Sequence, residues 1–162
     1  MQKVISNSSA VIHLAKINKL DILREYFQTI TIPERVYKEC IVEGKGRPEI
    51  ETIKKSDWIN VKHVKDKNLV KLLSTTLDDG EAEAIALAIE TGADLILLDD
   101  SDAREKARLY RLNITGIIGV LLRAKIDSKI DSLKATLTEL RSSGFRIDED
   151  LERCLLKEAG EL

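Results

Sequence analysis

The chain has 162 residues, which fits a single domain, and its 43% hydrophobic content is enough for one packed core. Charged residues make up 33% of the chain with a net charge of only −2, so it lacks the overall positive charge of proteins that coat nucleic acids. The first residues carry no hydrophobic segment of a secretion signal, and the longest apolar run, 117–122, is too short to cross a bilayer. We therefore expect a cytoplasmic protein that does not enter membranes.

Strand and helix patterns alternate along the chain, which predicts parallel βα units. The expected strands are 3–6, 28–32, 58–64, 95–99 and 113–115, with 58–64 alternating like an edge strand. The expected helices are 10–17, 21–26, 33–40, 49–55, 81–88, 103–110, 116–124, 132–141 and 149–159. Pro33 is expected at a first helical position, where its missing N–H costs nothing, and 44–48 is expected to end that helix.

This order of elements predicts an α/β protein with three layers, α/β/α, around a central, mostly parallel sheet. Residues 1–162 are expected to form one domain. Within it, we expect 128–162 to be a C-terminal helical extension packed on the rest.

The stretch 95–102 runs four aliphatic residues directly into three carboxylates, those of Asp99, Asp100 and Asp102. An apolar run of this kind is typical of a strand buried on both faces of a parallel sheet. Ligands of such sheets bind outside the carboxyl ends of the strands. Because neighbouring acids repel one another unless a cation lies between them, the stretch indicates a divalent-metal site.

Three other oxygen-bearing side chains are expected at the same edge of the sheet. Glu81 begins a helix whose roughly ten residues advance about 15 Å, and the strand that follows returns a similar distance toward Asp99. Asn7 leaves the first strand at its carboxyl end, and Glu39 lies about two turns into the helix after the second strand. The sequence thus predicts that Asn7, Glu39, Glu81 and Asp99 point toward one edge.

Each of these residues also has a purely structural interpretation. Asn7 can cap the first helix, Glu81 can form a capping box with Asp78, and Glu39 can be a solvated helix residue. Asp99 is the hardest to explain in this way, because a carboxylate after four buried aliphatic residues needs a partner. The exposed stripe expected at Arg104, Arg108 and Arg111 would either neutralise RNA phosphates or simply be solvated.

Four motifs taken together resemble the successive motifs of PIN domains. They are Ser6-Asn7-Ser8-Ser9-Ala10-Val11-Ile12, Val36-Tyr37-Lys38-Glu39, Gly80-Glu81-Ala82-Glu83-Ala84-Ile85-Ala86-Leu87-Ala88 and Leu98-Asp99-Asp100-Ser101-Asp102-Ala103-Arg104. With its Gly-Phe-Arg-Ile segment at 144–147, the chain is similar to the VapC-like prokaryotic branch. The resemblance implies a metal-dependent ribonuclease that uses Mg²⁺ or Mn²⁺, often the toxin of a toxin–antitoxin pair. It also implies RNA as substrate, a small antitoxin as partner, and a homodimer.

The resemblance implies site residues at matching positions. Catalytic positions fall on Asn7, Glu39, Glu81 and Asp99. Metal ligands would be Asp99, Asp102, Glu81 and Asn7, with Asp100 as the alternative to Asp102, while Arg104 and Ser9 would contact RNA. A homodimer could use the apolar residues Leu151, Leu155 and Leu156, which could instead pack on the core.

Asn7 departs from the family pattern, in which this position is usually Asp. An amide offers one neutral oxygen where a carboxylate offers two charged ones, so the change should weaken Mg²⁺ binding, and Mn²⁺ accepts the same ligands. Two hypotheses follow. Either the chain is a metal-dependent endoribonuclease, or it is a catalytically impaired PIN-like module that binds protein or RNA.

Overall fold

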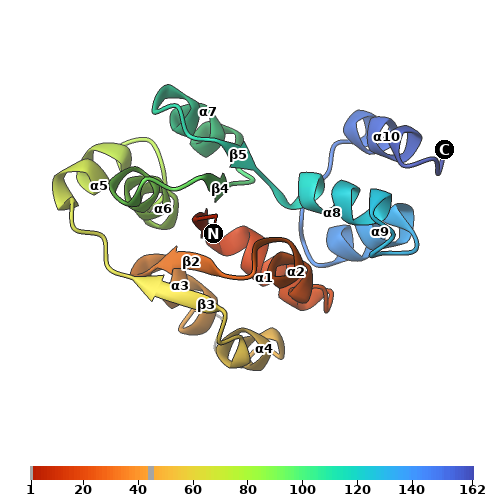
Figure 1. Ribbon diagram of the computed structural model, residues 1–162, viewed down its shortest axis with the longest axis horizontal. Coiled ribbons are helices and arrows are strands. Elements are labelled where there is room, and N and C mark those ends of the chain that lie inside the picture. The colour runs from red at the N-terminus through yellow and green to blue at the C-terminus, as the bar shows by residue number, and fades with distance from the viewer. Residues whose placement is uncertain (1, 44–45) are drawn as a thin grey trace.

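The computed structural model describes residues 2–43 and 46–162, which form one five-stranded sheet and ten helices (Figure 1). The strands are β1 (Val4–Ser6), β2 (Ile30–Pro33), β3 (Ile59–Lys62), β4 (Leu95–Leu97) and β5 (Ile114–Thr115). The helices are α1 (Ser8–Lys16), α2 (Asp21–Phe27), α3 (Glu34–Ile41), α4 (Glu49–Lys55), α5 (Lys67–Leu73), α6 (Asp79–Thr91), α7 (Ser101–Leu109), α8 (Ile117–Ile126), α9 (Leu133–Ser142) and α10 (Glu149–Glu158). Gly44 and Lys45, in the expected break after α3, lie outside the described residues.

The sheet is parallel throughout, with the strand order β3-β2-β1-β4-β5. The chain first builds outward from β1 through β2 to β3, then returns to place β4 on the other side of β1. The order therefore reverses between β1 and β4, and ligands of open parallel sheets bind beyond the strand ends at such a reversal. Asn7 follows β1 directly, and Asp99 follows β4 after one further residue.

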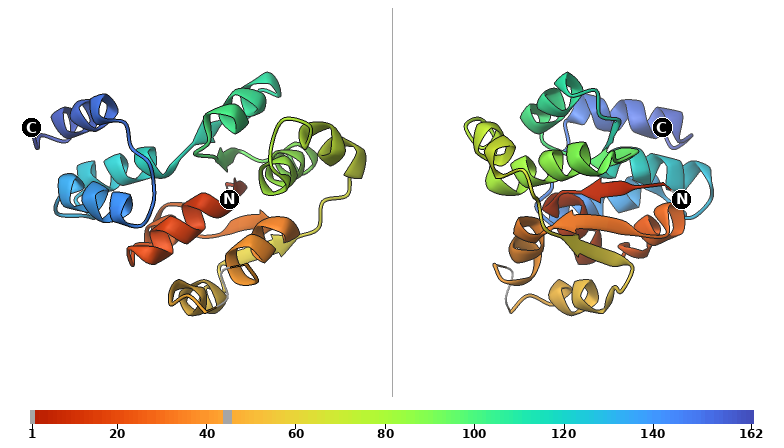
Figure 2. Two further views of the ribbon diagram at one scale, coloured as in Figure 1. Left: turned by 180° about the vertical axis from the view of Figure 1, so that it is seen from behind. Right: turned by 60° about the vertical axis from the view of Figure 1, so that its left-hand side comes forward.

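Helices cover both faces of the sheet, so the predicted three-layer α/β/α architecture is confirmed (Figure 2). Side chains alternate between two hydrophobic clusters, as strand geometry requires. Val4 and Leu97 face the cluster with α1, while Ile5, Ile96 and Leu98 face the cluster with α6. Helix α6 buries Gly80, Ala82 and 84–88, more than the single stripe predicted, because α3 and α5 also pack against it.

Several element boundaries differ from those expected. Pro33 pairs with Lys62 at the end of β2 and, with φ −72° and ψ 162°, precedes α3 as its N-cap instead of opening the helix. Helix α5 was not predicted, since it buries only Leu73 and so leaves almost no apolar period in the sequence. The expected edge strand is confirmed, because β3 lies at the end of the sheet.

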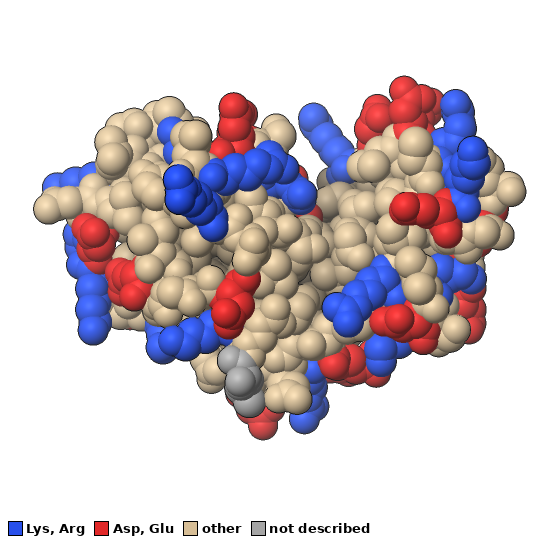
Figure 3. All heavy atoms as spheres, turned by 45° about the horizontal axis from the view of Figure 1, so that its top comes forward, with Lys and Arg blue, Asp and Glu red and all other residues tan. Residues whose placement is uncertain are grey.

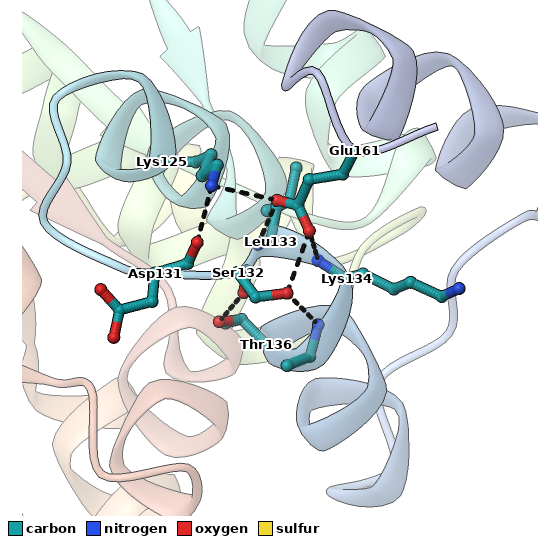
Figure 4. A network of polar contacts seen from close by, with 8 residues as sticks. Lys125, Asp131, Ser132, Leu133, Lys134, Thr136 and Glu161 are labelled. Carbon is teal, nitrogen blue, oxygen red and sulfur yellow. Dashed lines mark hydrogen bonds and ion pairs between the residues drawn. The ribbon is translucent and has the colours of Figure 1, made fainter.

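The last three helices pack on one another and on the core. Leu155 and Leu156 of α10 are buried in the same cluster as α1, whereas Leu151 is 45% exposed. Beyond α10, Glu161 is fastened to the N-terminus of α9 (Figure 4). Its carboxylate accepts hydrogen bonds from the Ser132 hydroxyl (2.9 Å) and from the backbone N–H groups of Leu133 (2.6 Å) and Lys134 (3.1 Å). None of the described helices is both long and apolar enough to span a membrane.

Candidate functional site

Asn7 directly follows β1, the central strand of the sheet, and is only 4% exposed. Its backbone N–H donates to the carbonyl of Leu97 (3.1 Å), which joins the end of β1 to the end of β4. Its side-chain oxygen accepts a hydrogen bond from Ala10 N–H (3.3 Å), so Asn7 is the N-cap of α1. The capping role considered from the sequence is therefore present, and it leaves a second lone pair on the amide oxygen.

Glu39 is held at the start of two other helices. The Ser8 hydroxyl, in the first turn of α1, donates to Glu39 Oε2 (2.7 Å), and the Arg35 guanidinium lies 3.7 Å from Oε1. The same carboxylate lies against Gly80 in the first turn of α6. Burial raises the pKa of Glu39 above its usual range, partly offset by the Ser8 hydrogen bond. Glu39 is thus a positioned, partly buried acid and not a freely solvated helix residue.

Glu81 forms the capping box that its spacing from Asp78 allows. Its backbone N–H donates to Asp78 Oδ1 (2.8 Å), and its Oε1 accepts from the Asp78 N–H (3.3 Å). Burial, followed by repulsion from the Asp78 carboxylate and a smaller contribution from Asp100, raises the pKa of Glu81 to about 7. Asp78 and Asp100 therefore lie within electrostatic range of Glu81, near the start of α6. The surroundings of Glu81 disfavour its negative charge.

Asp99 is the most buried acid of the group. Its Oδ1 accepts a hydrogen bond from Ile117 N–H (2.9 Å) at the start of α8. Burial raises its pKa, while the Ile117 bond, the nearby Ser9 hydroxyl and the Arg104 charge act in the opposite direction. Its second oxygen, Oδ2, is buried and accepts no hydrogen bond of good geometry from any residue in the described part of the chain. A buried carboxylate oxygen in this state is costly unless a ligand completes it.

The remaining predicted residues lie on α7. Arg104 turns inward and donates from Nη1 to the carbonyl of Leu98 (3.1 Å), so it braces the end of β4. Asp100 caps α7 by accepting from Ala103 N–H (3.0 Å), and its charge acts on Glu81. Asp102 is exposed and lines a surface pocket of about 400 Å³ with Thr76, Leu77, Glu105, Lys106 and Leu109.

The structure brings these groups to one edge of the sheet, at the N-terminal ends of α1, α6, α7 and α8. Glu39 joins α3 to α1 and α6, Glu81 connects electrostatically to α7, and Asp99 joins β4 to α8. Among residues 2–43 and 46–162, however, no three His, Cys, Asp or Glu side chains are close enough together to hold a metal ion. The metal roles of Asn7, Glu81, Asp99 and Asp102 therefore stay predictions.

Charge elsewhere on the surface is mixed. Figure 3 shows acidic and basic side chains interspersed over the face that carries α7 and α10, as the low net charge suggests. Arg108 and Arg111 are both exposed. This arrangement offers no broad basic surface on that face. The RNA contacts expected of Arg104 and Ser9 likewise stay predictions.

Four residues of this edge make contacts that the sequence motifs do not predict. Ser8 donates a hydrogen bond to Glu39, and the Asp78 carboxylate repels that of Glu81. Gly80 lies directly against Glu39, and Gly116 lies directly against Asp99. Only the Asp78–Glu81 spacing gave a sequence signal, as a capping box. Gly80 opens one of the four motifs, but nothing in the sequence shows what either glycine contacts, because this depends on which side chain approaches it from another element.

A comparison with protein families gives one match, over residues 3–161, to a family model described as a PIN domain. The match includes every candidate site residue and both hydrophobic clusters. A search of curated proteins found no match to the chain.

Proposed function

Because this chain belongs to the PIN-domain family, whose fold is in general a nuclease fold, we propose that it is a metal-dependent endoribonuclease that hydrolyses RNA phosphodiester bonds. One observation carries the proposal: Asp99 Oδ2 is buried at the reversal point of the sheet and accepts no hydrogen bond of good geometry from the described residues, although the Ser9 hydroxyl lies nearby. A bound cation would satisfy this oxygen and would favour the ionised form of Glu81, whose pKa is raised by burial and then by repulsion from Asp78.

The donor set suits a hard cation. Asp99, Glu81 and Asn7 would supply oxygen ligands, and Asp102 would be an additional acid, as Mg²⁺ or Mn²⁺ requires. When bound, the cation would activate a water molecule and neutralise charge on the scissile phosphate.

The protein's own residues prepare this site before any ligand arrives. Ser8 holds the Glu39 carboxylate in one orientation, and Ile117 N–H does the same for Asp99. Arg104 fixes the backbone of Leu98, immediately before Asp99. Acids held in this way lose little further conformational entropy when a ligand binds, which favours catalysis.

We further propose that the protein is the toxin of a toxin–antitoxin pair, acts in the cytoplasm as a homodimer, and is inhibited by a small antitoxin. The support is the motif likeness to the VapC-like branch, including the segment 144–147. Arg104 and Ser9 would contact the RNA substrate in this proposal.

One feature favours a second candidate function, that of a catalytically impaired module that binds protein or RNA. Asn7 is a neutral amide, and its oxygen already accepts the α1 cap bond. The site therefore has one negative charge fewer than a PIN nuclease with Asp at this position, and its metal affinity should be lower.

Cleavage of single-stranded RNA by the purified protein tests the two candidates, with Mg²⁺ or Mn²⁺ and then with a chelator. We expect cleavage that needs the metal and stops with the chelator. Asn7→Asp should raise the rate, and Asn60→Asp, which makes the same change on the exposed edge strand β3, should not. A wild-type protein without cleavage that gains it through Asn7→Asp would establish the second candidate and reject the first.

A further inference from the structure

Two glycines stand against the two best-positioned acids of the site. Gly80 lies in the first turn of α6, and Gly116 is the N-cap of α8. Neither has a positive φ, and Gly116 has φ −142°, which any residue can adopt. Backbone conformation therefore does not explain why glycine occupies these positions. The explanation is the small space beside each glycine, which has no room for a Cβ atom.

At Gly80 the space is filled by the carboxylate of Glu39. A Cβ atom added to Gly80 would overlap Glu39 Oε1 and lie only 2.8 Å from Cδ and 2.9 Å from Oε2. All three atoms belong to the end of a flexible side chain, so a methyl group would move the carboxylate and leave the helix in place. The carboxylate would then be pushed out of the position in which Ser8 holds it at 2.7 Å.

At Gly116 the space is filled by Asp99 and its supports. An added Cβ would lie 2.7 Å from Asp99 Oδ1, 3.0 Å from Arg104 Nη1 and 3.2 Å from the Leu98 carbonyl oxygen. Asp99 is short and Oδ1 already accepts from Ile117 N–H, so it has little freedom to retreat. A methyl group here would disturb both the acid and the backbone that carries it.

We propose that Gly80 and Gly116 are positioning residues, each leaving beside a helix N-terminus the space in which Glu39 or Asp99 is held for the site. We call this placement of a carboxylate the seating of the acid, and it is built in a similar way for Glu39 and for Asp99. Consecutive hydroxyls of α1 reach the two acids, Ser8 to Glu39 and Ser9 toward Asp99. The expected effect on catalysis rests on the proposed nuclease function, but the seating of the two carboxylates does not.

A double-mutant cycle in urea unfolding tests the seating of Glu39 without any activity. Ser8→Ala should lower the unfolding midpoint of the wild type, because it removes the hydrogen bond to Glu39. In a Gly80→Ala background that bond is already broken, so the same change should lower the midpoint by less than half as much. Gly119→Ala is the matched control, since Gly119 is exposed on α8 and its added Cβ would meet only Thr115 Oγ1. Equal midpoint shifts in all three backgrounds would overturn the proposal.

The catalytic consequence is measured separately, on RNA cleavage with Mn²⁺ and on Mn²⁺ affinity by titration calorimetry. Gly80→Ala and Gly116→Ala should each lower kcat by about tenfold or more, because the first displaces a proposed catalytic acid and the second a proposed metal ligand, with little change in KM for RNA. Gly119→Ala should keep wild-type values. If the cycle shows coupling while the wild type neither cleaves RNA nor binds Mn²⁺, the seating stands and the nuclease function fails. If the protein is active and both glycine variants keep full activity, the positioning role is rejected.

Discussion

Carboxylates meet helix N-termini in two regions of this protein, with opposite consequences. At the C-terminal end, Glu161 lies over the start of α9 with three donors, and the Lys125 ammonium lies 3.6 Å away. Although burial acts to raise it, these hydrogen bonds hold the pKa of Glu161 below its usual range. At the sheet edge, Glu39, Glu81 and Asp99 also lie at helix starts, but burial raises the pKa of each one.

The contrast shows that a helix N-terminus alone does not stabilise a carboxylate. Glu161 has a donor for each oxygen and a nearby cation, so its charge favours folding. Asp99 Oδ2 accepts no hydrogen bond of good geometry from the described residues, and Glu81 is repelled by two other acids. The first arrangement is complete in the protein alone, whereas the second lowers stability, and in our proposal a cation would complete it. Such a cost is expected where stability is exchanged for function.

The largest expected effect comes from Asp99→Asn. The amide keeps an acceptor for Ile117 N–H but removes the buried charge, so the variant should unfold at a higher urea concentration than the wild type at pH 7. Metal-dependent RNA cleavage should fall by at least about 100-fold, because the proposed ligand loses its charge. Cleavage that survives in Asp99→Asn would show that Asp99 is not part of the site.

Glu161→Gln should give the opposite result. Loss of the charge at the start of α9 should lower the free energy of unfolding by about 1 kcal/mol at pH 7, and RNA cleavage should stay unchanged. The pKa of Glu161 is lowered on folding, so its contribution is present above about pH 4.5 and is lost as the pH falls through the folded value. The difference from the wild type should therefore shrink at pH 3. A loss of cleavage with stability unaltered would remove the distinction between the two regions.

Much of the fold around the acids of the sheet edge could be predicted from the sequence, and the limits are physical. The apolar run before Asp99 and the period of 81–88 are local patterns, so they placed β4, α6 and their acids at the same sheet edge. The Asp78–Glu81 capping box is also local, and the structure contains it.

Contacts between elements distant in the chain could not be predicted. The approach of Glu39 to Gly80 depends on how α3 packs against α6, and the inward turn of Arg104 depends on its hydrogen bond to the carbonyl of Leu98. The Glu161 clamp joins residues 27 to 29 positions apart and has no periodic signal. Pro33 was expected to begin α3, but it ends β2, because pairing with β3 extends that strand as far as Pro33. The same residue would also suit the start of a helix.

The smallest expected effect, from Glu81→Gln, measures how much the acids at the start of α6 oppose folding. Since folding raises the pKa of Glu81 from 4.5 to about 7, the protonated form is favoured in the native state, and stability is lost as the pH rises through this interval. Glutamine keeps the capping-box acceptor but cannot ionise. Without divalent metal, Glu81→Gln should therefore match the wild type near pH 4 and exceed its free energy of unfolding by about 1 kcal/mol at pH 8, after allowance for solvent screening. Urea unfolding at the two pH values measures this, with Glu51→Gln on the exposed surface of α4 as the charge-matched control. A pH-independent difference, or an equal gain in the Glu51 variant, would mean that Glu81 is as well accommodated as Glu161, and that repulsion among these acids gives no reason for a cation to bind there.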